Sequence, residues 1–313
     1  VRQIFAGVDL DNVVRLTPRK TPNHPATLLL PLERLAVQMQ GGTWSELFNT
    51  ENLLNQYPVV GLVAWYIMIT LLGWVVYPTV RLAFRGLTDK GYPLARLVAL
   101  VLLALLSWWI GSVGLPVSRM TILLVVLLLA GINFGLFWLQ KNEMIVEWKT
   151  RRKYFLLAEG LMLAFFVLFL LVRLGNPDLW HPYKGGEKPM DFSYLNAVIK
   201  STTFPPYDPW FAGGYINYYY YGFVLIGMPI KLLGIVPSIA YNLFLPSLFA
   251  FFGMGAFSIG WNLWSVTRPG DKDEGAPLEP HDLDQNELIQ GTGEARISSS
   301  PFIVKAGAVY AGL

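Results

Sequence analysis

The run YFLLAEGLMLAFFVLFLLVRL extends from Tyr154 to Leu174 and contains only two charged residues, Glu159 and Arg173. A helix needs about 20 mostly apolar residues to cross the hydrocarbon core of a bilayer, and this run is long enough. It lacks the polar–apolar alternation of a barrel strand, and backbone polar groups in hydrocarbon need partners within the protein. The run therefore predicts a transmembrane helix.

Apolar runs of the same kind lie on both sides of it. They cover Tyr57 to Ala83, Leu94 to Val113, Met120 to Leu139, Tyr218 to Leu233 and Ser238 to Val266. A last run, Pro301 to Leu313, stops after 13 residues, which is too short to cross. We therefore expect an all-α, polytopic integral membrane protein with six transmembrane helices and a truncated seventh, as a fragment of a longer protein.

The composition excludes several classes of protein. Of the 313 residues, 54% are hydrophobic and 14% charged, whereas an average soluble domain has about 25% charged residues, so a soluble enzyme is excluded. The net charge of +3 is too small and dispersed for a nucleic-acid-binding face. The absence of cysteine excludes disulfides, thiolate nucleophiles and Cys-ligated metals. We expect no metal and no cofactor.

Basic residues predict the orientation, because Lys and Arg are retained on the cytoplasmic side. Two groups flank the predicted helices: Arg81, Arg85, Lys90 and Arg96, and Lys141, Lys149, Arg151, Arg152 and Lys153. With both groups inside, alternation places loops 175–217 and 267–300 on the outer face of the cell membrane and loop 234–237 on the cytoplasmic face.

Three parts of the chain follow from this pattern. Residues 1–56 are an outer-face polar segment, in which Leu28 to Met39 is predicted to be an amphipathic surface helix. Residues 57–148 are a three-helix transmembrane segment, either the tail of a preceding unit or an N-terminal extension. Residues 149–313 are expected to be a second, truncated membrane domain. Residues 267–300 are acidic and rich in Gly, Pro and Ser, which predicts a solvated insert.

Few ionisable residues lie within the predicted helices. Arg81, Arg96 and Arg173 are near helix ends, where we expect them to extend to the headgroups. Glu159 is either a residue at the cytoplasmic edge or a buried carboxylate with a role. A proton- or sodium-coupled transporter usually has ionisable positions near the midplane, and this chain offers few.

Loop 175–217 carries most of the groups that can do chemistry, and its length is unusual between two transmembrane helices. Phe192, Leu195, Val198 and Ile199 recur at helical spacing, which predicts a short helix at the membrane interface. Asp191 lies at the start of this helix. It is either an N-cap that accepts backbone N–H bonds or a catalytic carboxylate, and the two roles are compatible.

Other polar residues of the loop have structural alternatives. Asp208, within the run PPYDPW, is expected to form a turn. His181 has no partner at metal-ligand spacing, so a zinc or iron site is not expected. Glu187 and Lys188 are either a solvated pair or part of a site.

The run from Asn217 to Gly222, NYYYYG, is the most unusual feature of the loop. Tyrosine is common at the lipid–water boundary, so an aromatic belt is one interpretation. Four consecutive tyrosines, from Tyr218 to Tyr221, would point about 100° apart on a helix, so some of them must face protein or a ligand.

These residues resemble the YYY membrane protein family (Chlor_Arch_YYY). The matching words are GEKPMDF at 186–192, PPYDPWFAGG at 205–214 and NYYYYG at 217–222. The resemblance covers about half of the chain, from Lys149 to Leu313. It implies a large polytopic membrane protein and assigns no biochemical activity.

A looser similarity, in topology alone, is to GT-C glycosyltransferases. There a transmembrane helix leads into a long outer loop with an acidic residue and interfacial helices, and the order from Lys149 to Asp191 matches. In such enzymes a carboxylate takes a proton from an acceptor hydroxyl while a sugar leaves a polyprenyl-phosphate donor. Loop 175–217 contains no Asp-x-Asp or Glu-x-Asp, which argues against metal dependence.

This similarity implies roles for the loop residues. Asp191 is the first choice as general base and Glu187 the second. Cationic Lys184, Lys188 or His181 would neutralise the leaving phosphate, and Asp208, Asn217, Trp210 and the tyrosines Tyr218, Tyr219, Tyr220 and Tyr221 would line a substrate groove. The expected partners are membrane lipid, a lipid-linked sugar donor and a glycan or protein acceptor. A transporter or lipid flippase, and a non-catalytic scaffold, remain as alternatives.

Overall fold

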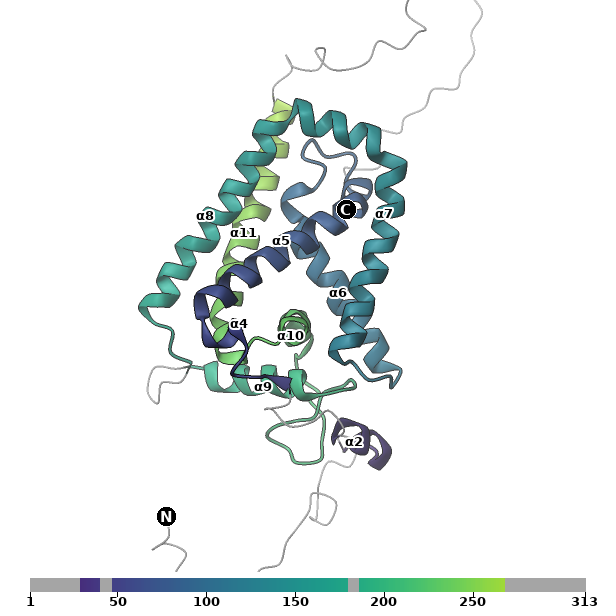
Figure 1. Cartoon of the computed structure of the whole chain (residues 1–313), viewed down its shortest axis with the longest axis vertical. Helices are drawn as coiled ribbons and strands as arrows, with labels where there is room; N and C mark the ends of the chain where they lie inside the picture. Colours follow the sequence, from purple (N-terminus) through teal and green to yellow (C-terminus); the bar gives the residue numbers. More distant parts are fainter. Residues whose placement is uncertain (1–28, 40–46, 180–185, 268–313) are drawn as a thin grey trace, which may run out of the picture. The chain divides into compact units, whose positions relative to one another are not determined.

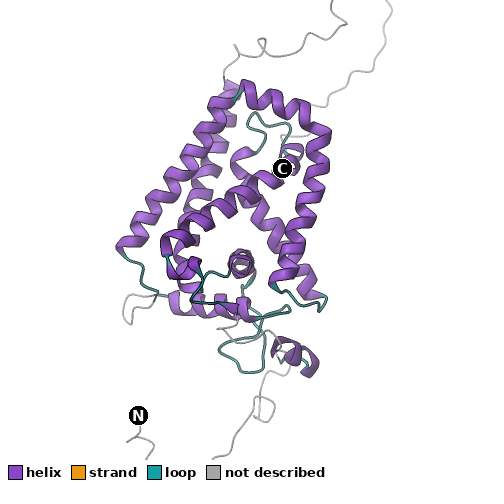
Figure 2. Ribbon diagram, viewed as in Figure 1, coloured by secondary structure: helices purple, strands orange, loops and turns teal. Residues whose placement is uncertain are grey.

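The computed structural model describes residues 29–39, 47–179 and 186–267. Across these residues the fold is all-α, with two isolated β-bridges as the only other regular pairing (Figure 2). Five helices are long and apolar enough to cross a membrane: α5 (Pro58–Ala83), α6 (Ala95–Ser112, preceded by the 3-10 turn η3, Tyr92–Leu94), α7 (Arg119–Thr150), α8 (Arg152–Gly175) and α11 (Pro237–Thr267). The prediction of a polytopic helical membrane protein is confirmed at this level.

The predicted count of six is not confirmed, because the fifth apolar run does not form a helix of membrane-spanning length. Helix α10 covers only Tyr221–Leu233, 13 residues that rise about 20 Å against a core of about 30 Å. It starts after Tyr220 and ends at Gly234, whose left-handed φ of 72° terminates it. Figure 1 shows α10 end-on, so it lies crosswise to the long helices. The predicted seventh helix, 301–313, lies outside the described residues.

The described chain has two ends, which we name by their contents. The basic end contains the α5–α6 connection and the junction of α7 with α8. The loop end contains the α6–α7 connection, the helices α9 (Lys188–Lys200) and α10, and the short helices α2 (Leu32–Met39) and α4 (Leu53–Gln56) (Figure 1).

Hydrogen bonds place the turn after α10 at the loop end. Asn55, beside α5, donates to Gly234 O at 2.9 Å and accepts from Val236 N at 2.8 Å. Helix α11 then runs back to the basic end, where Asn262 accepts from Thr88 N at 2.8 Å. The predicted placement of 234–237 opposite to loop 175–217 is therefore wrong, and α11 ends at the opposite end from the one predicted.

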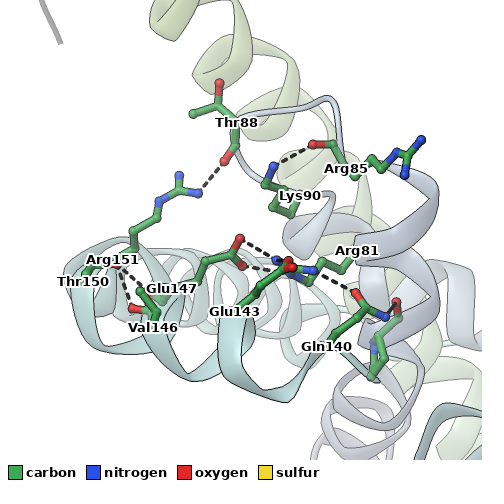
Figure 3. Close-up of polar contacts among 11 residues, drawn as sticks. Arg81, Arg85, Thr88, Lys90, Gln140, Glu143, Val146, Glu147, Thr150 and Arg151 are labelled. Carbon is green, nitrogen blue, oxygen red and sulfur yellow. Dashed lines mark hydrogen bonds and ion pairs between the residues drawn. The ribbon is translucent and has the colours of Figure 1, made fainter. Parts of the chain in front are cut away.

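A network of ion pairs ties α5 to α7 at the basic end (Figure 3). The buried Arg81 guanidinium donates to Glu143 and to both carboxylate oxygens of Glu147 at 2.8–3.0 Å, and to Gln140 at 2.8 Å. Helix α7 bends so that these last turns run across the end of the molecule (Figure 1). Arg81 does not extend to headgroups as predicted, because two acidic side chains of α7 satisfy it internally.

The two other arginines near helix ends are buried as well. Arg96 on α6 forms an ion pair with Glu159 on α8, and the Tyr92 hydroxyl donates to the same carboxylate at 2.5 Å. Arg173 donates to the side-chain carbonyl of Asn242 on α11. The prediction that these arginines reach outward is wrong, and Glu159 proves to be a partly buried carboxylate with two partners.

The loop end is held together by contacts between segments far apart in sequence. Val117 N donates to Thr202 O at 2.6 Å, and Phe204 N donates to Gly111 O at 3.1 Å. The predicted amphipathic helix is confirmed in part as α2. Its Gln38 bonds to the backbone of residues 202, 203 and 205. These contacts form a crosswise layer of α9, α10 and the 201–220 segment under the long helices.

Candidate functional site

Helix α9 is the predicted interfacial helix, and its amphipathic pattern explains its position. It begins at Lys188 and buries Leu195, Val198 and Ile199, while Phe192 makes an edge contact with Tyr241 of α11. Gly227 of α10 crosses it so closely that an added Cβ would lie 3.3 Å from Val198. The helix is thus fixed on one side and presents its first turn on the other.

Asp191 lies in that first turn, but it is not the N-cap. Glu187 occupies the cap position, and its side chain makes no capping hydrogen bond. The Asp191 carboxylate accepts no hydrogen bond from the described residues, and its backbone N–H bonds to Glu187 O. The N-cap interpretation of Asp191 is therefore wrong, and this carboxylate is left available to a ligand.

The surroundings of Asp191 change its acidity. Burial raises the pKa of the Asp191 carboxyl, and the charge of Glu187 raises this pKa further. Partial burial also raises the pKa of the Tyr219 phenol, with added effects from the charges of Asp191 and Glu187. Asp191, Glu187 and Tyr219 therefore act on one another electrostatically, which brings three of the predicted site residues together.

The four tyrosines divide into two pairs. Tyr220 accepts a hydrogen bond from Trp108 Nε1 of α6 at 3.0 Å, and the Tyr221 ring makes an edge contact with the same tryptophan. Tyr218 and Tyr219 lie against each other with ring centroids 4.2 Å apart, and they are 62% and 47% exposed. Tyr220 and Tyr221 thus hold the start of α10 against α6, whereas Tyr218 and Tyr219 are exposed.

The segment after α9 supplies Asp208, Trp210 and Asn217. One Asp208 oxygen accepts from Trp210 N at 2.8 Å and from Phe211 N at 3.2 Å, so its predicted turn role is confirmed. Partial burial and the nearby charge of Asp208 raise the pKa of Tyr194, which also lies on α9. Trp210 and Asn217 are exposed, and no contact of theirs with Asp191 is seen.

The predicted cations are less well placed. Lys188 Nζ lies 3.5 Å from the backbone O of Asp178 and makes no ion pair with Glu187 in the described part of the chain. His181 and Lys184 lie outside the described residues. No group of three or more His, Asp or Glu able to hold a metal ion is present in residues 29–39, 47–179 and 186–267.

A cation-lined cavity at the loop end was missed by sequence reasoning. It encloses about 370 Å³, and Arg119, Lys200 and Lys231 lie in its wall together with Ser118 and Thr202. Burial lowers the pKa of Lys231 to about 8. Lys231 is the one charged residue of the Tyr218–Leu233 run. The run was predicted to be a transmembrane helix, and its lysine was not singled out.

A comparison with protein families identifies one match. The model of an uncharacterized membrane protein family, DUF2298, matches residues 102–295, which is more than half of the chain. This match is consistent with a YYY-type membrane family. No curated protein and no solved structure matches the chain.

Proposed function

We propose that this protein is a transferase that moves a sugar from a polyprenyl-phosphate donor to an acceptor at the outer face of the cell membrane. The chain belongs to the uncharacterized membrane protein family DUF2298. The observation that carries the proposal is the Asp191 carboxylate. It stands in the first turn of α9, accepts no hydrogen bond from the described residues, and its charge acts on the exposed Tyr219.

The chemistry needs one base and one leaving group. Asp191 takes the proton of an acceptor hydroxyl, the freed oxygen bonds to the anomeric carbon, and the carbon–oxygen bond to the donor phosphate breaks. The phosphate keeps the electron pair and leaves on the polyprenyl lipid. A base positioned within about 2.6–3.2 Å of the hydroxyl accelerates such a step about 10²–10⁴-fold.

The surroundings of Asp191 support this role. Burial, together with the charge of Glu187, raises the pKa of Asp191, which matches a base that must accept a proton. The exposed rings of Tyr218 and Tyr219 offer apolar faces for a sugar or for the first isoprene units, and their hydroxyls offer hydrogen bonds. Lys188 is the described cation at this end of α9 that would offset the charge of the leaving phosphate.

The test is glycan transfer by membranes that contain the full chain, supplied with radiolabelled polyprenyl-phosphate sugars. Asp191→Asn should lower transfer at least 100-fold with unchanged expression. Glu51→Gln, which neutralises an exposed carboxylate at the loop end, is the control and should leave transfer unchanged. Equal transfer by wild type and Asp191→Asn would refute the proposal.

A second candidate, lipid movement, is favoured by two observations. The short crosswise helix α10 and the ion pair between Arg96 and Glu159 are features that membrane transporters use near their substrate paths. If the protein is a flippase, proteoliposomes should show lipid movement that survives Asp191→Asn. Movement that is lost with this variant, or absent from wild type, would exclude the candidate.

A further inference from the structure

The cavity at the loop end is formed by five segments that meet beside the crosswise layer, one of them Leu47 and Phe48 ahead of α4. Its wall includes Val37 from α2, Pro116 to Arg119 at the start of α7, Lys200 at the end of α9 and Lys231 near the end of α10. Its volume of about 370 Å³ lies within the range of small-molecule sites, about 300–1,000 Å³.

Lys231 is the central feature of this cavity. Its side chain is buried, and its ammonium donates to Val117 O at 2.5 Å and to Ser201 O at 3.2 Å. An ammonium has three protons, so one remains beyond these two bonds. The ion pairs among the described residues involve Arg81 and Arg96, so no described carboxylate neutralises Lys231.

A buried charge without a counter-charge is costly, and proteins retain such groups where something else compensates them. Two carbonyl oxygens offset part of this cost, because they are dipoles aimed at the ammonium. They carry no net charge, however, and the desolvation of Lys231 remains unbalanced by any described acidic side chain. An anion in the adjoining cavity would supply the missing charge.

The rest of the wall is suited to the same kind of ligand. Arg119 donates Nε to Leu232 O at 2.8 Å, which leaves its two terminal amino groups without a partner in the described ranges. Lys200 adds a third cation, and its ammonium makes no bond to a described residue. Ser118 caps α7 at this point, so the positive end of a 32-residue helix also faces the region.

We propose that this cavity binds a phosphate or diphosphate group. A single carboxylate would leave most of the three positive charges uncompensated, whereas a phosphate monoester or diphosphate carries two or more negative charges and several acceptor oxygens. The group can belong to a soluble phosphate or to a lipid headgroup, since the recognising atoms are the same. Binding here does not depend on the transfer reaction, because Asp191 lies nine residues, about 14 Å, along α9 from Lys200.

The experiment uses the full chain purified in a neutral detergent. Isothermal titration with inorganic pyrophosphate tests a soluble ligand, and nanodiscs of phosphatidylcholine with or without phosphatidic acid test a headgroup, read out by thermal unfolding. We expect saturable stabilisation in at least one arm. The arm that responds identifies the source of the phosphate, and no response in either arm overturns the proposal.

Matched variants separate the site from general charge effects. Lys231→Met should weaken binding at least tenfold, and the double variant Arg119→Gln/Lys200→Gln, which changes no buried side chain, should do the same if Lys231→Met fails to fold. Arg85→Gln removes an exposed cation at the basic end and should bind like wild type. Binding unaffected by the double variant would refute the site.

Asp191→Asn distinguishes this proposal from the proposed transferase function. The variant should bind phosphate like wild type even though transfer is lost. Normal phosphate binding by a protein without any transferase activity would leave the cavity assignment intact and refute only the catalytic one. Tight binding that is lost with Asp191→Asn would contradict the assignment of the anion to this cavity.

Discussion

At the scale of single residues, the raised pKa of Asp191 has a consequence for stability. A carboxyl whose pKa is higher in the folded state than in the unfolded state destabilises the fold once it is ionised, at pH above the folded value. This cost disappears as the pH falls below the unfolded pKa of about 3.9, where both states are protonated.

We therefore predict that Asp191→Asn does not lower the melting temperature at pH 7 and raises it slightly. The difference from wild type should disappear near pH 3.5, measured by thermal unfolding in detergent. Activity should show the opposite preference, since the base must be ionised, and should fall with decreasing pH above the range where an ordinary aspartate titrates. A clear loss of stability at pH 7 would show that Asp191 has structural partners.

Glu159 should behave in the opposite way. Glu159→Gln removes the counter-charge of Arg96, whose side chain is 3% exposed, and breaking such a buried pair costs about 3–5 kcal/mol. We predict a large drop in melting temperature, which the double variant Arg96→Met/Glu159→Met should largely reverse. A single variant as stable as wild type would mean that the pair does not contribute to the fold.

The arginines show what a sequence leaves open at this scale. The positions of Arg81, Arg96 and Arg173 near helix ends were readable from the sequence, but the side chains opposite them were not. Glu143 and Glu147 lie one turn apart on α7, and both reach Arg81 on α5. Asp191 was expected at the start of a short helix, and α9 confirms that helix, whereas the distinction of Asp191 from a cap required the exact start of α9.

At the scale of elements, the contact between α9 and α10 is the least predictable part of the site. The spacing of apolar residues predicted α9. The apolar run that contains α10 did not show whether it crosses a membrane or lies buried across a helix bundle, because both kinds of helix have the same composition. Gly227 marks the difference, because its lack of a Cβ allows α10 to lie directly on Val198 and Ile199. The cation-lined cavity depends on this contact, which explains why it was missed.

We predict that Gly227→Leu destabilises the protein by about 1–3 kcal/mol, because the new side chain must push α10 away from α9. Gly222→Leu is the control, since nothing lies within 4 Å of an added Cβ at that position. The measurement is thermal unfolding of both variants in the same detergent. Equal stability would mean that the two helices are not in close contact.

At the scale of the whole molecule, the number of membrane-crossing helices decides on which side of the membrane each loop lies. With the five long helices of the described residues crossing and α10 not crossing, the residues before and after α10 lie on the same side, whereas six crossing helices would put them on opposite sides. Asn217 and Ser238 both lie at the loop end, on opposite sides of α10 in sequence, whereas Gly86 lies at the basic end. All three positions are exposed, and the sequence contains no cysteine. Single cysteines can therefore be introduced without interference.

Asn217→Cys and Ser238→Cys should react with a membrane-impermeant maleimide from the same side of intact cells, and Gly86→Cys only after permeabilisation. Positive residues retained inside put the first two on the outer face. If Ser238→Cys is labelled together with Gly86→Cys, α10 crosses the membrane and the crosswise arrangement is wrong. Labelling of Gly86→Cys alone in intact cells would invert the orientation.

The surplus length of α7 has one more consequence. Its 32 residues rise about 48 Å, well beyond the hydrocarbon thickness, and the excess lies flat with the exposed Ile145, Val146 and Trp148 beside the charges that hold Arg81. An amphipathic segment of this kind is stable at the lipid–water interface, because its apolar side chains favour lipid and its charged side chains favour water. We therefore expect this segment to fix the depth of the basic end in bilayers of different lipid tail length.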